Sequence, residues 1–364
     1  MIVQDFLRSF PTPRVALEAI RQPPHGVVVV TDGRRALLNY GLDTPKGGMY
    51  GECRALMLAL PSFDVLSMSF KRFYNAHEGQ AAKIDWATAA VEEKVDGSLI
   101  VFYRDGEHWT FHTRGTLDAE GGFSDAPGTF RACVLALIER ETGGSPDGLF
   151  ADENEDHCFI CEYVGPYNRI VTRYDCEDLY LLALMDRRRQ VELLGAEHAV
   201  EWPFSRPCRY DLPRTLEALQ ASFSTLPPLS EGYVVRDGAC NRIKVKDPSY
   251  LAIFHAVNAG SGEKEKHFAR LALLGDTAEI KGYFPEFAAR IAGYELRVER
   301  MAAGAEALWT LHHDAPSQKD FAAAVKDTPL SPWLFLRRAG KTTLGARAWM
   351  RETYRPERLT GKEN

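Results

Sequence analysis

Several features that mark particular protein classes are missing from this sequence of 364 residues. It has no uninterrupted apolar run of membrane-spanning length, and its opening residues, MIVQDFLRSF, lack the basic region and long apolar segment of a secretory signal. We therefore expect no membrane partner and a cytoplasmic location. An excess of positive charge is also missing, because the formal net charge is -6. This charge argues against a protein that coats nucleic acid by bulk electrostatics, so any nucleic-acid surface must be local.

Cysteine is sparse, and its pattern does not suggest disulfides. The seven cysteines are an odd number and are scattered along the chain, which suits reduced thiols in a cytosolic protein. Cys158 and Cys161 have CxxC spacing, but no second cysteine or histidine pair follows at the spacing of a zinc site. We interpret both as buried packing residues of a strand.

The chain has enough apolar residues, 45% of the total, for one large core or two ordinary ones. Strand patterns dominate residues 91–247. After that the pattern is helical, with apolar residues at alternating spacings of four and three from Phe287 to Leu308. We predict an α+β fold with antiparallel sheets in a domain over residues 1–251 and an all-helical C-terminal domain over residues 252–364.

Turn residues predict some local structure. The segment Arg104-Asp105-Gly106-Glu107 between two aromatic-rich strands predicts a hairpin. A helix is predicted from Thr129 to Glu141, with Gly143 as its C-terminal stop. The segments GYVVRD and NRIKVK are predicted to pair as strands on either side of Gly238.

The most informative segment is Glu92-Glu93-Lys94-Val95-Asp96-Gly97-Ser98-Leu99, in which a lysine between acids precedes a sharp turn and an apolar run. It predicts a strand that delivers Lys94 to a phosphate-handling cleft. A lysine amine has a pKa of about 10.4, so it is a poor nucleophile at neutral pH unless burial or neighbouring cations lower that value.

Candidate neighbouring cations lie in Arg242-Ile243-Lys244-Val245-Lys246. Alternation at strand period places Arg242, Lys244 and Lys246 on one face. Three cations on one face repel one another, and a nucleotide phosphate would relieve that repulsion. The alternative is an edge strand that its lysines keep soluble.

Carboxylates occur in matching places. Glu162 lies in an otherwise apolar strand, and Glu231 lies where the chain enters another strand. Together with Asp96 they would suit a magnesium ion, which prefers a few carboxylates together with water and phosphate oxygens. Each carboxylate alone is more often structural, but their occurrence together with Lys94 indicates a metal-dependent nucleotide site.

These motifs, in this order, resemble the covalent nucleotidyltransferase superfamily of polynucleotide ligases and mRNA capping enzymes. The motifs of that superfamily are matched by KVDGS at Lys94, FICEYVGPYNRIV at Phe159 to Val171, SEGYVVR at Ser230 to Arg236, and RIKVKDPSY at Arg242 to Tyr250. The second of these segments is similar to the RNA ligase 1 family, the phage tRNA-repair type. That family also has counterparts of Gly51 to Ala55, Lys71 to Asn75 and Phe111 to Thr116.

The resemblance implies an antiparallel-sheet nucleotidyltransferase domain of the ATP-grasp-like ligase kind over residues 1–251, in which residues 1–90 contact the triphosphate. The helical domain, residues 252–364, would select RNA. The implied activity is ATP-dependent joining of 5′-phosphate and 3′-hydroxyl RNA ends through lysyl-AMP and RNA-adenylate, in RNA repair. Nicked tRNA is the candidate substrate, and an end-healing kinase/phosphatase is a candidate partner.

Three lysines would carry the chemistry if the resemblance holds. Lys94 would attack the α-phosphate of ATP and hold AMP as a phosphoramidate. Lys244 and Lys246 would neutralise the charge that grows on that phosphate in the transition state.

The other implied site residues bind ATP or metal. Asp96 and Glu231 would orient the water shell of Mg²⁺ or Mn²⁺, and Glu162 would bind the ribose or the same shell. The remaining contacts with ATP would come from Arg54 and Arg72 at the β and γ phosphates, Glu93 at the adenine edge, and Gly97 and Arg114 along the site. Arg72 and Arg114 stand where the family usually has lysine, which keeps the charge but changes its geometry.

Two groups of alternatives stay open. A capping-type guanylyltransferase or a DNA ligase usually carries an OB-fold after the lysine domain, where this chain is predicted to be helical. A noncatalytic RNA- or nucleotide-binding module would not need the nucleophile.

A basic stretch near the C-terminus has two interpretations, a local nucleic-acid surface or an ordinary solvated helix face. It comprises Arg337, Arg338, Lys341, Arg347, Arg351, Arg355, Arg358 and Lys362.

Overall fold

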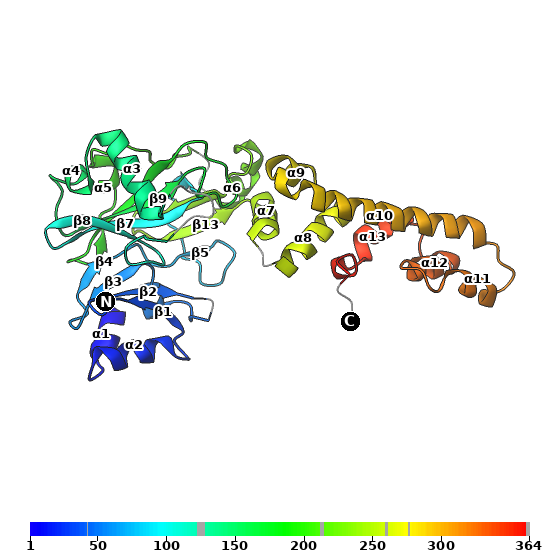
Figure 1. Cartoon of the computed structure of the whole chain (residues 1–364), viewed down its shortest axis with the longest axis horizontal. Coiled ribbons are helices and arrows are strands. Elements are labelled where there is room, and N and C mark those ends of the chain that lie inside the picture. Colours follow the sequence, from blue (N-terminus) through cyan, green and yellow to red (C-terminus); the bar gives the residue numbers. More distant parts are fainter. Residues whose placement is uncertain (42, 122–127, 212–214, 259–260, 276, 362–364) are drawn as a thin grey trace. The chain divides into compact units, whose positions relative to one another are not determined.

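The computed structural model describes residues 1–41, 43–121, 128–211, 215–258, 261–275 and 277–361. The chain divides into two compact units, Met1–Leu251 and Ala252–Asn364. In the described residues, the first unit combines helices with sheets that are antiparallel except for one short parallel pairing, and the second contains only helices, so the predicted α+β fold is confirmed (Figure 1).

The N-terminal part of the first unit is a four-stranded antiparallel sheet in the order β1-β2-β3-β4. Its strands are β1 (Val27–Thr31), β2 (Arg35–Tyr40), β3 (Leu56–Ala59) and β4 (Val65–Ser67). Two helices, α1 (Ile2–Arg8) and α2 (Pro13–Arg21), contribute their apolar residues to the same core as β2 and β3. A 3-10 helix, η1 (Gly48–Gly51), lies between β2 and β3 in the chain.

A five-stranded antiparallel sheet in the order β11-β10-β9-β7-β8 follows. Its strands are β7 (Ser98–Asp105), β8 (His108–Thr113), β9 (His157–Val164), β10 (Asp178–Asp186) and β11 (Val191–Glu192). The helices in this part of the chain are α3 (Phe130–Thr142), α4 (Pro146–Leu149) and α5 (Ala196–Ala199). The predicted hairpin joins β7 to β8, and the predicted helix is α3, which ends at Gly143 in the left-handed conformation.

A second four-stranded sheet has the order β5-β13-β12-β6. Its strands are β5 (Tyr74–Asn75), β6 (Ala90–Glu93), β12 (Gly232–Arg236) and β13 (Arg242–Lys246). The antiparallel pairing of β12 with β13 confirms the predicted strand pair, and β12 also pairs with β6. Helix α6 (Leu216–Ala221) and the 3-10 helix η2 (Phe223–Thr225) precede β12 in the chain.

The helical elements begin with α7 (Pro248–Asn258), α8 (Ser261–Leu274), α9 (Ala278–Tyr283) and the long α10 (Pro285–His312). They continue with α11 (Gln318–Val325), α12 (Ser331–Arg338), α13 (Ala346–Thr353) and η3 (Pro356–Arg358). Ile291, Val298 and Ala305 of the predicted apolar stripe are buried on α10, which confirms the stripe as core. None of the described helices has the length and apolar character that crossing a membrane requires.

Three cations of the basic C-terminal stretch have partners inside the helical unit. Arg337 lies 2.6 Å from the Glu306 carboxylate, and Arg347 lies 3.0 Å from that of Glu299. Arg338 donates to the carbonyl of Ala315 at 2.7 Å. These bonds stabilise the packing of the helices, which favours a structural role for these three residues. Lys362, the last cation of the stretch, lies outside the described residues.

Candidate active site

Lys94 follows strand β6 directly, and its backbone N–H donates to the Gly232 carbonyl at 2.9 Å, which extends the pairing with β12 by one residue. The chain then turns through Gly97 into β7. A Cβ at Gly97 would overlap the carbonyl oxygen of Tyr163, so the close approach of this turn to β9 requires glycine. The sequence thus places a lysine at the end of β6, the outermost strand in the order β5-β13-β12-β6, and turns sharply after it.

Asp96 lies within this turn, and its buried carboxylate has three protein donors. Its Oδ2 accepts from the backbone N–H groups of Val171 at 3.0 Å and Thr172 at 2.8 Å, and its Oδ1 accepts from the Tyr250 hydroxyl at 2.7 Å. The bonds tie the lysine turn to the chain after β9 and to α7. Because both oxygens are engaged, the geometry favours a positioning role for Asp96 over the metal contact expected from the sequence.

Glu231 joins two of the predicted lysines. Its buried carboxylate lies 2.5 Å from the Lys94 ammonium through Oε2 and 2.5 Å from the Lys246 ammonium through Oε1. Burial alone would lower the pKa of Lys94, but the carboxylates of Glu231, Glu162 and Asp96 outweigh it and hold that pKa above its ordinary value. The predicted nucleophile is therefore an ion-paired amine whose raised pKa favours the protonated form.

Glu162 differs from the other two predicted metal carboxylates. No hydrogen bond or ion pair to its side chain occurs among the described residues, and burial raises its pKa to about 7 although Lys94 and Arg54 oppose the rise. A carboxylate with both oxygens available fits a hydrated divalent cation or a ribose hydroxyl. Glu162 is thus the predicted metal ligand that fits best, whereas the lysines hold both oxygens of Glu231.

Four predicted cations lie against aromatic rings without a carboxylate partner among the described residues, whereas Arg242 and Lys246 lie against rings and also pair with glutamates. The Arg54 guanidinium lies 4.5 Å from the centre of the Phe70 ring, and the Lys244 ammonium lies 5.0 Å from that of Phe73. The other two share one ring, that of Tyr40, at 4.0 Å for Arg72 and 4.3 Å for Arg114. We call Arg54, Arg72, Arg114 and Lys244 the cationic group.

Within the described ranges, no member of the cationic group forms an ion pair with a carboxylate. One buried guanidinium nitrogen of Arg54 and one of Arg72 have no hydrogen-bond partner at all. Burial, followed by the charges of Lys94, Arg54 and Lys246, lowers the pKa of Lys244 to about 8. Aromatic faces attract cations without neutralising them, so these residues keep donors and charge for an anionic ligand.

Arg242 has a different environment from the two lysines on its strand. Two of its nitrogens lie 2.5 Å from the two oxygens of Glu192, which also lies 2.9 Å from Arg236. Arg236 further pairs with Glu197. Glu192 thus neutralises Arg242, although Arg242 lines the hollow that contains Lys94, whereas Lys244 and Lys246 line a different hollow.

The one cluster of three metal-type ligands found among the described residues is Glu92, Glu197 and His198, and it lies within the same arginine network. Arg236 already pairs with both glutamates of that cluster, so the cluster does not fit a cation. The predicted set of Asp96, Glu162 and Glu231 is not brought together in this way.

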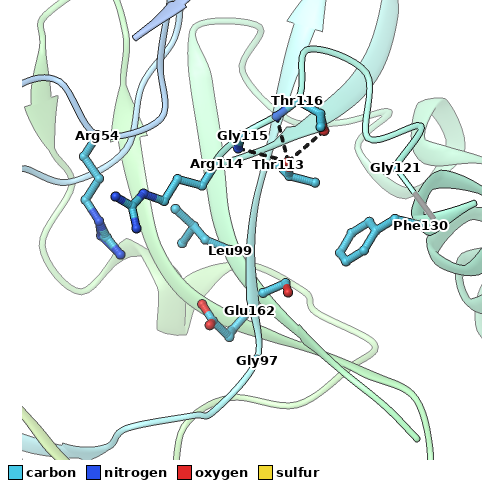
Figure 2. A pocket seen from close by; sticks show the side chains of 11 residues that line it. Arg54, Gly97, Leu99, Thr113, Arg114, Gly115, Thr116, Gly121, Phe130 and Glu162 are labelled. Atoms are coloured by element: carbon cyan, nitrogen blue, oxygen red, sulfur yellow. Dashed lines mark hydrogen bonds between the residues drawn. The ribbon is translucent and has the colours of Figure 1, made fainter. Parts of the chain in front are cut away.

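Two adjoining hollows contain most of the predicted residues. The first, which we call the nucleotide cleft, is lined by Lys94, Glu93, Glu162 and Arg54 together with Leu182 and Val234. Burial raises the pKa of Glu93, and its carboxylate accepts from the Cys208 N–H at 3.3 Å. The second hollow measures about 450 Å³ and shares Arg54 and Glu162 with the cleft (Figure 2).

Lys244 and Lys246 line another hollow, of about 320 Å³, with Asn75 and His77, whereas Arg72 lines a separate one with Lys71 and Tyr74. The cationic group therefore reaches several adjoining surfaces rather than a single pocket.

Several residues of the site are not predicted from the sequence. These are the aromatic side chains under the cations, Tyr40, Phe70 and Phe73, and the apolar walls of the cleft, Leu182 and Val234. The one sequence feature that could have indicated the aromatic residues is the high frequency of aromatic side chains near Arg72. Ordinary core segments have the same frequency, so this feature does not mark a binding site.

Comparison with known proteins gives the family. A family model described as RNA ligase matches residues 52–250. A protein of Autographa californica nuclear polyhedrosis virus, described as a bifunctional polynucleotide kinase/RNA ligase, is 30% identical over 261 residues, which are 67% of this chain and 36% of that protein. An RNA ligase of Rhodothermus phage RM378 is 26% identical over 212 residues, 50% of this chain and 47% of the phage protein.

The chain thus spans less than half the length of these two curated relatives. Among solved structures, an archaeal ATP-dependent RNA ligase has a TM-score of 0.45 and 12% identity, covering 93% of this chain and 82% of its own. Since the family model covers more than half of the sequence, this protein belongs to the RNA ligase family.

Proposed function

We propose that this protein is an ATP-dependent RNA ligase that joins 5′-phosphate and 3′-hydroxyl RNA ends through a lysyl-AMP intermediate. The observation that carries the proposal is the cationic group beside Lys94. These four cations are held by aromatic rings without carboxylate partners among the described residues. Arg54 lines the cleft that contains Lys94, and the charge of Lys94 acts on Lys244, so cations without counter-ions suit a polyphosphate at this lysine. Family membership supports the same reaction class.

In the first step the deprotonated Lys94 amine forms a bond to the α-phosphorus of ATP, and the bond to the pyrophosphate oxygen breaks. Arg54, Lys244 and Lys246 would stabilise the charge that moves onto the phosphate oxygens and the leaving pyrophosphate. The proton of Lys94 must leave before attack, and the Glu231 carboxylate at 2.5 Å is the group in position to accept it.

In the second step a phosphate oxygen of the 5′-phosphate RNA end displaces Lys94 from the AMP, which gives RNA-adenylate, and the departing Lys94 nitrogen takes back the proton that Glu231 accepted. In the third step the 3′-hydroxyl of the other end attacks the phosphorus of the former 5′-phosphate, loses its proton, and displaces AMP. The same cationic group would hold the reacting phosphates in both steps.

A divalent cation, Mg²⁺ or Mn²⁺, would supply charge neutralisation at the reacting phosphate when it is bound. Glu162 would hold it, because its carboxylate has no other partner among the described residues. Glu231 would contribute to its water shell, and Asp96 would keep the lysine turn in place.

We assign the RNA substrate to repair, with nicked tRNA as the candidate. The viral relative is described as a kinase joined to a ligase, which supports a separate end-healing enzyme as a partner of this chain. The helical unit would contribute RNA choice. All seven cysteines are free, which supports a location in the cytoplasm.

The experiment that tests this function is incubation of the protein with α-labelled ATP or GTP and magnesium. We expect an acid-labile, alkali-stable adduct from ATP only, and none in Lys94→Ala. An adduct from GTP would indicate a capping-type enzyme. Sealing of a nicked anticodon stem-loop should follow, and a protein that seals only DNA nicks would contradict the RNA substrate.

A further inference from the structure

The proposed chemistry of Lys94 leaves the hollow beside the nucleotide cleft without an assigned ligand. We call it the side pocket (Figure 2). It measures about 450 Å³ and meets the cleft at Arg54 and Glu162, but Lys94 does not line it. Beyond this border its walls are formed by Leu99, Thr113, Arg114, Gly115, Thr116 and Phe130.

One wall is a preformed polar loop that follows strand β8. The Thr113 hydroxyl accepts from the backbone N–H groups of Gly115 at 3.1 Å and Thr116 at 3.0 Å, and it lies 2.7 Å from the Thr116 hydroxyl. The loop therefore keeps one shape and presents peptide and hydroxyl groups to the pocket.

The facing wall is apolar. Phe130, the first residue of α3, lies across the pocket from the arginines, and Leu99 of β7 lies between them (Figure 2). Apolar side chains opposite polar backbone form a combination that binds a nucleobase and its sugar, because the base needs apolar contact and the sugar needs hydrogen bonds.

The charge of the pocket limits the ligand further. Arg114 is the one cation among its lining residues beyond the border, and it is exposed and held by the Tyr40 ring and carbonyl. A single cation matches a phosphodiester, which carries one negative charge, better than a triphosphate, which needs several cations. Glu162 at the border adds a negative charge, which opposes a polyanion.

We infer that the side pocket binds one nucleoside of the RNA ends, with the base against Phe130 and Leu99 and the adjoining phosphodiester at Arg114. This inference rests on the proposed ligase function. The nucleoside belongs to either the strand with the 5′-phosphate or the strand with the 3′-hydroxyl, which share this chemistry, and the experiment distinguishes them.

Gly115 offers a way to fill the pocket. A Cβ at Gly115 would meet no atom within 4 Å, and its backbone is not in the left-handed region, so a larger side chain is tolerated locally. We expect Gly115→Leu to occupy space that the nucleoside needs. Gly148→Leu is the matched control, because Gly148 is equally open but lies in α4, outside the pocket.

Two reactions are measured on the full chain. The first is lysyl-AMP formation from labelled ATP. The second joins a pre-adenylated RNA donor to a 3′-hydroxyl RNA acceptor, with the KM determined for each strand. We expect Gly115→Leu to raise the KM of one strand at least about tenfold more than it slows lysyl-AMP formation, a difference of about 1.4 kcal/mol. The strand affected identifies the source of the nucleoside.

Thr116→Val is a second variant, which removes a hydroxyl but keeps the shape of the side chain. Thr116→Val should raise the KM of the same RNA strand, and this KM tests the inference if Gly115→Leu fails to fold. The inference would be overturned if a variant slowed both reactions equally, or if both variants joined RNA as fast as the unsubstituted protein. The ligase function would still stand in that case, provided that the unsubstituted protein forms lysyl-AMP. If the unsubstituted protein forms no lysyl-AMP, the proposed function fails and the inference falls with it.

Discussion

The Glu231 carboxylate lies 2.5 Å from the Lys94 ammonium, so the residue proposed as nucleophile is ion-paired to an acid. The same carboxylate also binds Lys246, and the pKa of Lys94 is held above its ordinary value. An amine in this state cannot attack. Activation therefore requires that the pair separate or that the proton pass to the carboxylate when ATP and metal enter.

The first prediction concerns Glu231→Gln. Removal of the carboxylate charge takes away the strongest charge that raises the pKa of Lys94 and leaves only Glu162 and Asp96 to oppose burial, so that pKa should fall. Competitive acylation of Lys94 as a function of pH, read by mass spectrometry, measures that value. Lysyl-AMP formation should nevertheless drop, because proton acceptance and metal orientation are lost. An unchanged titration of Lys94 would contradict the role of the pair.

The second prediction concerns Lys244, whose pKa is lowered to about 8. Only the protonated form attracts phosphate, so affinity for ATP should be full below pH 8 and should fall as the pH rises through that value. Fluorescence titration of ATP at several pH values measures this. In Lys244→Arg the side chain stays charged, and the decline should disappear. The same decline in the variant would mean that another group titrates.

The third prediction separates positioning from metal binding at Asp96. In Asp96→Asn, the amide side chain cannot accept hydrogen bonds from all three donors that the carboxylate binds, which are the N–H groups of Val171 and Thr172 and the Tyr250 hydroxyl. The turn that contains Lys94 should therefore become less ordered, and lysyl-AMP formation should slow by about tenfold or more. The magnesium concentration that gives half-maximal rate should stay the same. A large increase in that concentration would show instead that Asp96 contacts the metal, and Glu162→Gln provides the comparison.

The fourth prediction concerns the arginine network behind β12 and β13. Arg236 is buried, and Arg236→Met leaves the carboxylates of Glu192 and Glu197 without it. We expect the free energy of unfolding to fall by about 3–5 kcal/mol in urea titrations. The control is Arg173→Met, because the partner of Arg173 among the described residues is Asp175, in an exposed pair for which a change of about 0–1 kcal/mol is expected. Similar losses in both variants would contradict the role of burial.

Local patterns were enough to predict much of the fold. The β7–β8 hairpin and the β12–β13 pair have turn residues between alternating strands, and α3 has a cap and a glycine stop. Such features depend on neighbours in the sequence, which is why periodicity and turn chemistry find them.

The site was predictable in its residue types but not in its pairings. Alternation places Arg242 with Lys244 and Lys246, but it cannot show that Glu192, fifty residues earlier, neutralises only the first of these. Likewise, the sequence marks Asp96 as an acid near the lysine, and only the fold brings three donors to it. Ion pairs and hydrogen bonds between distant segments leave no periodic signal.

The placement of the cationic group on aromatic rings has an energetic consequence. Like charges that gather without counter-ions repel one another, so the ligand-free fold carries a repulsion that a triphosphate relieves. Part of the affinity for ATP would then arise from this relief and from side chains already aimed before binding, with no further contact needed. Loss of pyrophosphate restores the repulsion, which leaves the protein ready to attract the next phosphate, that of an RNA end.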